Sequence, residues 1–207
     1  MKALLSHESG GPETLRLTDL PDPRPGPGEL LVRVRACSIN YPDVLIIEDK
    51  YQLKPPLPFT PGVEAAGDVI EVAEQVAGVA AGDRVIVKLR HGAYADEAVV
   101  TPSHLMSLPS TFDYAEGAKF LAAHGTAYHA LIDRGQIQAN EVLLVHGAGG
   151  SVGLAAVEIG KMLGATVIAA ASSEGKLAVA RAKGADHEVL YGREPFRDAV
   201  KRLTDGR

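Results

Sequence analysis

The residues best suited to chemistry are glycines that follow a short apolar run and open a helical pattern. The sequence HGAGGSVG occupies residues 146–153, directly after the apolar residues 142–145. Glycine lets a backbone turn sharply and approach a pyrophosphate, and a helix N-terminus offers unpaired N–H donors and the positive end of the helix dipole. We therefore predict a loop that binds the phosphates of a dinucleotide. Its predicted contact residues are Gly149, Gly150, Ser151, Val152 and Gly153.

The spacing of these glycines departs from the strict G-x-G-x-x-G pattern. Gly147 and Gly149 give its first half, but Gly153 comes four residues after Gly149. A glycine-rich turn between a strand and a helix, with no ligand, is the alternative interpretation.

The second predicted strand of this region ends without the carboxylate that holds the ribose 2′-OH in NAD sites. Ala171 occupies that position, Ser172 and Ser173 follow, and Lys176 comes one helical turn later. A carboxylate would repel a 2′-phosphate, whereas a lysine attracts it. We therefore predict NADPH as the cofactor, bound in part by Ser172, Ser173 and Lys176. The alternative is that Ser173 caps the next helix and Lys176 is merely solvated.

The elements that must position these residues follow two different patterns. Residues 1–124 contain short strands between Gly and Pro turns, which is typical of a barrel or sandwich. These strands are expected at 30–36, 62–72, 85–87 and 93–100, and helices are expected at 114–123 and 126–133. Strands at 142–145, 166–171 and 188–190 then alternate with helices at 151–163, 174–183 and 195–203. This alternation predicts a parallel sheet, so the fold class is α/β plus β.

Composition and charge exclude several kinds of function. The chain of 207 residues has a net charge of −5, which argues against a protein that works by neutralising nucleic-acid phosphates. Its single cysteine, Cys37, excludes a disulfide framework or a cysteine-rich zinc lobe. The N-terminus lacks signal-peptide features, and no apolar run is long enough to cross a bilayer. We expect a cytoplasmic protein with no nucleic-acid or membrane partner.

Short motifs spread along the whole chain carry a family resemblance. They are PGPGE at 25–29, SINYPD at 38–43, PGVEAAG at 61–67, GDRV at 82–85, GAYA at 92–95, GTAYHA at 125–130 and SSEGK at 172–176. Together with the glycine loop, these motifs resemble the zinc-independent quinone oxidoreductases, the zeta-crystallin-like branch of the medium-chain dehydrogenase/reductase superfamily. The resemblance implies a GroES-like catalytic domain over residues 1–124 and a Rossmann domain over residues 125–207. It also implies that this Rossmann domain is incomplete, with the C-terminal strands of its sheet absent.

The resemblance implies hydride transfer from NADPH to a quinone or another conjugated carbonyl, without zinc. Zinc-dependent members carry a cysteine at the position of Asn40 and a histidine at the position of Val63, and neither side chain here is a useful zinc ligand. Cys37 lies three residues too early, so we expect a small buried apolar side chain rather than a ligand. We expect no metal, a small quinone or enone as substrate, and a homodimer for an intact relative.

The resemblance also implies roles for single residues. Asn40 would line the nicotinamide and substrate site and donate to the substrate oxygen as charge develops, or it would only form a turn. Tyr51 would face the substrate and orient a carbonyl or donate a proton, or it would be an aromatic residue at a cleft rim. Thr126 would meet the nicotinamide end or cap a helix. Tyr191 would cover the adenine side, and Glu64 would make a structural hydrogen bond.

Two other functions remain open at this point. An enoyl-thioester reductase shares the fold and cofactor but needs an acid that protonates the substrate carbon, so a change at Tyr51 would separate the two reactions. A catalytically inert truncated or binding protein is the other alternative.

Overall fold

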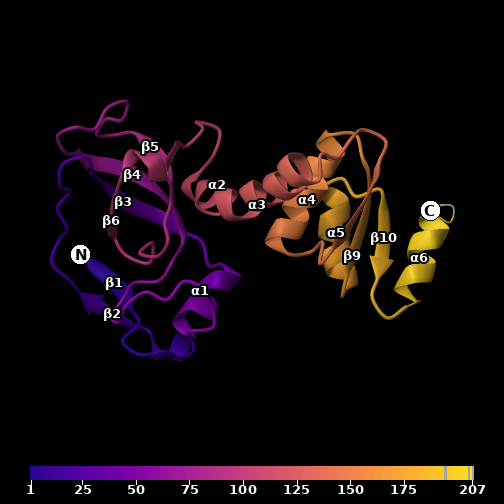
Figure 1. Cartoon of the computed structure of the whole chain (residues 1–207), viewed down its shortest axis with the longest axis horizontal. Coiled ribbons are helices and arrows are strands. Elements are labelled where there is room, and N and C mark those ends of the chain that lie inside the picture. The colour runs from indigo at the N-terminus through magenta and orange to yellow at the C-terminus, as the bar shows by residue number, and fades with distance from the viewer. Residues whose placement is uncertain (194, 205, 207) are drawn as a thin grey trace. The chain divides into compact units, whose positions relative to one another are not determined.

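The computed structural model describes residues 1–193, 195–204 and 206. The chain forms two compact units, Met1–Leu121 and Ala122–Arg207, drawn from indigo to yellow in chain order in Figure 1. The sequence-based domains, 1–124 and 125–207, stay a prediction of which part serves which ligand, and Glu194, Asp205 and Arg207 of the second lie outside the described residues.

The first unit is built on a five-stranded antiparallel sheet in the order β6-β3-β4-β5-β7. Its strands are β3 (Leu30–Cys37), β4 (Glu64–Val72), β5 (Arg84–Lys88), β6 (Glu97–Val100) and β7 (Leu105–Ser107). Alternation along β3 buries Leu30 and Val32 against Val69 of β4 and leaves Arg33 and Arg35 exposed, as half-buried strands require.

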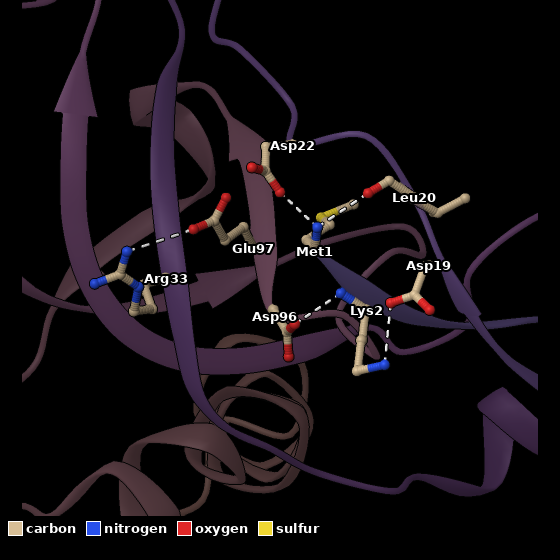
Figure 2. Close-up of polar contacts among 8 residues, drawn as sticks. All are labelled: Met1, Lys2, Asp19, Leu20, Asp22, Arg33, Asp96 and Glu97. Atoms are coloured by element: carbon tan, nitrogen blue, oxygen red, sulfur yellow. Dashed lines mark hydrogen bonds and ion pairs between the residues drawn. The ribbon is translucent and has the colours of Figure 1, made fainter.

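Two further strands and two helices complete this unit. They are β1 (Lys2–Leu5), β2 (Arg16–Asp19), α1 (Tyr41–Ile47) and α2 (Tyr114–Ala118), with single 3₁₀ turns at Pro12–Thr14 and Pro102–His104. Strands β1 and β2 pair antiparallel. Figure 2 shows how polar contacts tie this pair to its surroundings: the Met1 ammonium lies 2.5 Å from Asp22, and the Lys2 amide donates to Asp96 at 2.7 Å.

The second unit contains three parallel strands in the order β10-β9-β8. The strands β8 (Val142–His146), β9 (Thr166–Ala171) and β10 (His187–Leu190) alternate with the helices α4 (Ser151–Met162), α5 (Glu174–Ala182) and α6 (Phe196–Leu203), as Figure 1 shows. Val157 of α4, Val167 of β9 and Leu177 of α5 belong to one buried core. Gly164 and Gly184 end helices α4 and α5 at φ of 80° and 108°, the left-handed geometry that glycine permits. The predicted fold class, α/β plus β, is confirmed.

The structure corrects the expected helices between residues 114 and 133. Helix α2 stops at Ala118, and α3 (Thr126–Tyr128) is flanked by π-helical turns at Leu121–Gly125 and His129–Arg134. Gly117 and Gly125 lower the helical propensity of this segment, which favours a break and irregular turns over two regular helices.

Two other expectations change in the first unit. The strand expected over 93–100 begins only at Glu97, because the Tyr94 amide donates to the carbonyl of Pro61 at 3.0 Å in a loop. Helix α1 lies in a stretch to which the sequence pattern assigned no element. Asp43 accepts from the Asn40 backbone amide at 2.8 Å and so closes the first turn of this helix.

Candidate functional site

The glycine loop joins the carboxyl end of β8 to the N-terminus of α4. Gly147 turns the chain at φ +65°, and the Gly150 amide donates to its carbonyl at 2.9 Å. Helix α4 begins after Gly150, whose position offers no side-chain cap. The Leu154 amide makes the first bond back, to Gly150, at 2.8 Å. The amides of Ser151, Val152 and Gly153 therefore precede the intrahelical ladder and are available to an anion.

Two glycines of this loop allow close approaches that a side chain would block. A Cβ on Gly153 would overlap the Gly147 carbonyl oxygen and lie 2.8 Å from the Cα of Ala148. A Cβ on Gly149 would lie 2.5 Å from the Cβ of Lys176. The loop is therefore a tight cradle in which α4 meets the backbone and the Lys176 stem crosses Gly149. This geometry fits the diphosphate of a dinucleotide.

Lys176 brings a positive charge to the end of β9. Its Nζ donates to the hydroxyl of Ser172 at 3.1 Å, and both side chains are exposed. Ser173 caps α5, since its hydroxyl accepts from the Lys176 amide at 3.4 Å. The helix-cap role considered for Ser173 is thus observed. The ammonium group and the Ser172 hydroxyl form the polar corner where a 2′-phosphate is predicted.

Tyr191 lies just after β10 and reaches the glycine loop. Its hydroxyl accepts from the Gly147 amide at 2.9 Å and donates to the Ala170 carbonyl at 3.1 Å. The neighbouring His146 and Phe196 rings lie 4.4 Å apart between centroids. Sequence reasoning missed His146 and Phe196 as parts of this aromatic cluster. Cover of an adenine ring by Tyr191 stays a prediction, and the structure adds a hydrogen-bonded anchor to the loop.

Asn40 and Tyr51 belong to the first unit, whereas Thr126, the glycine loop, Lys176 and Tyr191 belong to the second. Asn40 is the N-cap residue of α1, and its Nδ2 donates to the Ser38 hydroxyl at 2.8 Å. The Tyr51 ring packs against an apolar cluster that includes Ile46, Ile47 and Phe59. Thr126 is exposed at the start of α3.

Two acids are buried close to Asn40 in the first unit. Asp43 is 3% exposed and Glu64 is 1% exposed. The Tyr94 hydroxyl donates to Asp43 at 2.9 Å. Burial raises the pKa of the Asp43 carboxyl, and the hydrogen bond from the Asn40 backbone amide opposes this effect. Glu64 accepts from the backbone amide of Leu121, which is the structural hydrogen bond expected for it.

Among residues 1–193, 195–204 and 206, no group of three or more His, Cys, Asp or Glu side chains is arranged to hold a metal ion. The expectation that Cys37 is buried is wrong: the residue is exposed, because it lies on the same face of β3 as the exposed Arg33 and Arg35. No helix within the described part of the chain is long and apolar enough to cross a bilayer.

Comparison with known proteins places this architecture in a known group. Residues 26–110 match the family model described as alcohol dehydrogenase GroES-like domain, and residues 151–207 match the one described as zinc-binding dehydrogenase. The chain is 34% identical over 206 residues to the human synaptic vesicle membrane protein VAT-1 homolog, covering 99% of this chain and 52% of that protein. It is 36% identical over 207 residues to human quinone oxidoreductase, covering 99% of this chain and 63% of that protein.

Solved structures agree with these matches. An NAD-dependent alcohol dehydrogenase superposes with a TM-score of 0.95 at 34% identity, covering 100% of this chain and 68% of that one. Escherichia coli quinone oxidoreductase complexed with NADPH superposes with a TM-score of 0.93 at 31% identity, covering 100% and 63%. The fold is thus a GroES-like domain followed by a Rossmann-like parallel sheet. The chain belongs to the medium-chain dehydrogenase/reductase superfamily, among its quinone oxidoreductase-like members.

The chain spans about half to two thirds of the length of the relatives it matches. Their activities are therefore a basis for proposal only.

Proposed function

We propose that this protein is an NADPH-dependent oxidoreductase that transfers hydride to a quinone or another conjugated carbonyl without zinc. The observation that carries the proposal is the position of Lys176: its stem crosses Gly149 of the glycine loop and its Nζ meets Ser172 at the end of β9. A charge in that corner favours a ribose that carries a phosphate. The names of several relatives, among them human quinone oxidoreductase, support the substrate class.

NADPH, when bound, supplies the hydride, and the residues of this chain hold it in place. The amides of Ser151, Val152 and Gly153 would face the diphosphate, together with Gly149 and Gly150. Lys176 and Ser172 would hold the 2′-phosphate, with Ser173 alongside. The solved relatives include both an NADPH complex and an NAD-dependent enzyme, so the cofactor preference rests on these residues.

The substrate side would lie in residues 1–124 and the cofactor side in residues 125–207. Asn40 would donate a hydrogen bond to the substrate oxygen, Tyr51 would orient the carbonyl, and Thr126 would meet the nicotinamide. The proposal of zinc-free chemistry rests on residue types, because Asn40 and Val63 stand at the positions where the family resemblance implies zinc ligands in zinc-dependent members. A cytoplasmic location and a homodimer are part of the same proposal.

The experiment that tests the cofactor proposal is a fluorescence titration of the 207-residue chain with NADPH and with NADH. We expect NADPH to bind at least tenfold more tightly than NADH, and Lys176→Met to abolish most of that difference. A tenfold difference in affinity corresponds to about 1.4 kcal/mol of binding free energy, and we assign it to the charge-assisted contact of Lys176. Methionine keeps a stem over Gly149 and removes only the charge. Lys183→Met is the matched control, since that lysine pairs with Glu158 rather than facing the loop. Equal binding of both cofactors by the unaltered chain would contradict the proposal.

An enoyl-thioester reductase is a second candidate, favoured by one observation. The Tyr51 side chain packs against the apolar residues Ile46, Ile47 and Phe59, and its hydroxyl would serve as the acid. Tyr51→Phe should nearly abolish enoyl reduction but leave most quinone reduction, because hydroquinone oxygens take protons from water. Cofactor binding without turnover of either substrate would favour a binding protein.

A further inference from the structure

A line of hydrogen bonds leads from a buried carboxylate to the Asn40 side chain. The Asn40 Nδ2 lies 2.8 Å from the Ser38 hydroxyl, and that hydroxyl lies 3.5 Å from Glu64 Oε2. Glu64 is almost fully buried, and its other carboxylate oxygen accepts from the Leu121 amide. The line thus begins at a buried carboxyl group that the backbone holds in place.

The chemistry of these groups fixes the direction of each bond. The Ser38 hydroxyl donates its proton to Glu64 Oε2. A lone pair of the same hydroxyl is then left to accept from Asn40. The side-chain amide of Asn40 is therefore oriented with its nitrogen toward Ser38, which leaves its second N–H for another partner.

The backbone of Asn40 is held separately by the second buried acid. Asp43 Oδ2 accepts from the Asn40 amide at 2.8 Å and from the Tyr94 hydroxyl at 2.9 Å. Main chain and side chain of Asn40 are thus fixed by different carboxylates, one on α1 and one on β4. A surface asparagine that served only as a helix cap would need no such second support.

We propose that Ser38 and Glu64 are positioning residues that orient the side-chain amide of Asn40 for its contact with the substrate carbonyl or the nicotinamide. The inference rests on the proposed function, since it assigns Asn40 its role in the reaction. Ser38 and Glu64 touch neither reactant and act only through Asn40.

The test compares Ser38→Ala, Ser38→Thr and Asn40→Ala, with Ser103→Ala as a control at an exposed serine of the same unit. With NADPH and 1,4-benzoquinone, we expect Ser38→Ala to lower kcat about tenfold with little change in the Kd for NADPH, because a misdirected amide loses a transition-state contact. Threonine keeps the hydroxyl and should restore kcat. Because both substitutions disrupt the same hydrogen-bonded contact, the double variant should have the same kcat as Asn40→Ala alone. Additive losses, or an unchanged kcat in Ser38→Ala, would overturn the inference.

A second readout works without turnover. The side-chain NH₂ resonances of Asn40, identified by their loss in Asn40→Ala, should move and exchange faster in Ser38→Ala and Glu64→Gln but not in Ser103→Ala. If the chain shows this response but neither binds NADPH nor reduces quinone, the proposed function fails while the positioning of Asn40 stands. If the Asn40 resonances are unchanged in Ser38→Ala and Glu64→Gln, the positioning role is overturned even where the enzyme is active.

Discussion

The hydroxyl of Tyr191 accepts a hydrogen bond from the amide of Gly147 at 2.9 Å, across 44 residues of sequence. The same hydroxyl donates to the Ala170 carbonyl, which also accepts from the Ala148 amide at 3.0 Å. The first turn of the glycine loop is thus bound to the carboxyl end of β9 by a side chain that follows β10. A loop fixed in this way has less conformational freedom to lose when it binds a ligand.

Removing this hydroxyl should loosen the loop without touching its charge. We expect Tyr191→Phe to lower the free energy of unfolding by about 1 kcal/mol, the net worth of a typical hydrogen bond. NADPH and NADH should both bind more weakly, with their affinity ratio unchanged, since the diphosphate cradle is common to both. Titration of the two cofactors checks this. A change in the ratio alone would instead show that the hydroxyl contacts the 2′-phosphate.

Gly153 and Gly175 are a matched pair for testing the cradle. Gly153→Ala should destabilise the second unit and abolish cofactor binding, because its Cβ would overlap the Gly147 carbonyl oxygen. Gly175→Ala, in the first turn of α5, meets no atom within 4 Å and should be neutral or stabilise by up to about 1 kcal/mol. Thermal unfolding and an NADPH titration measure both effects. Tolerance of Ala at 153 would show that α4 can shift away from the loop.

The ion pairs of Glu158 predict a dependence of stability on pH. Burial alone raises the pKa of Glu158, but hydrogen bonds from Lys183 at 2.7 Å and His124 at 3.0 Å lower it below its usual value. A lowered folded-state pKa means that the ionised carboxylate stabilises the fold above its unfolded pKa, and that this stability is lost as the pH falls through the folded value.

Glu158→Gln should therefore lower the unfolding temperature at about pH 7 and have a smaller effect at about pH 4, near the reference pKa of glutamate. A substitution of Arg193 offers a control, because its ion pair with Glu174 is largely exposed and should contribute little to the unfolding temperature at either pH. An effect of Glu158→Gln that is constant between the two pH values would contradict this account.

The sequence predicts the second unit well because its signals are local. Fully buried parallel strands such as Thr166–Ala171 appear as short apolar runs, and the glycines at 164 and 184 mark helix ends. The glycine loop follows β8 and the serines before Lys176 follow β9, so the parallel pairing of these two strands brings them to the same edge of the sheet.

The remaining features depend on tertiary contacts that no local pattern shows. The bond between Tyr191 and Gly147 requires β10 and β8 to flank β9. The line from Glu64 through Ser38 to Asn40 requires β3 and β4 to pair. Helix α1 escaped prediction because its seven residues are too few to establish a helical period, and its first turn depends on the Asp43 carboxylate.

The contact between the Lys176 stem and Gly149 has an evolutionary consequence. The methylene groups of this side chain lie where a Cβ on Gly149 would stand, so they form one wall of the loop while the ammonium group faces Ser172. One residue therefore serves both packing and charge. A descendant that replaces Lys176 with a small side chain to accept a different cofactor would also open a gap beside the loop. The route with fewer side effects is a new carboxylate at position 172, which neutralises the local positive charge and leaves that wall intact.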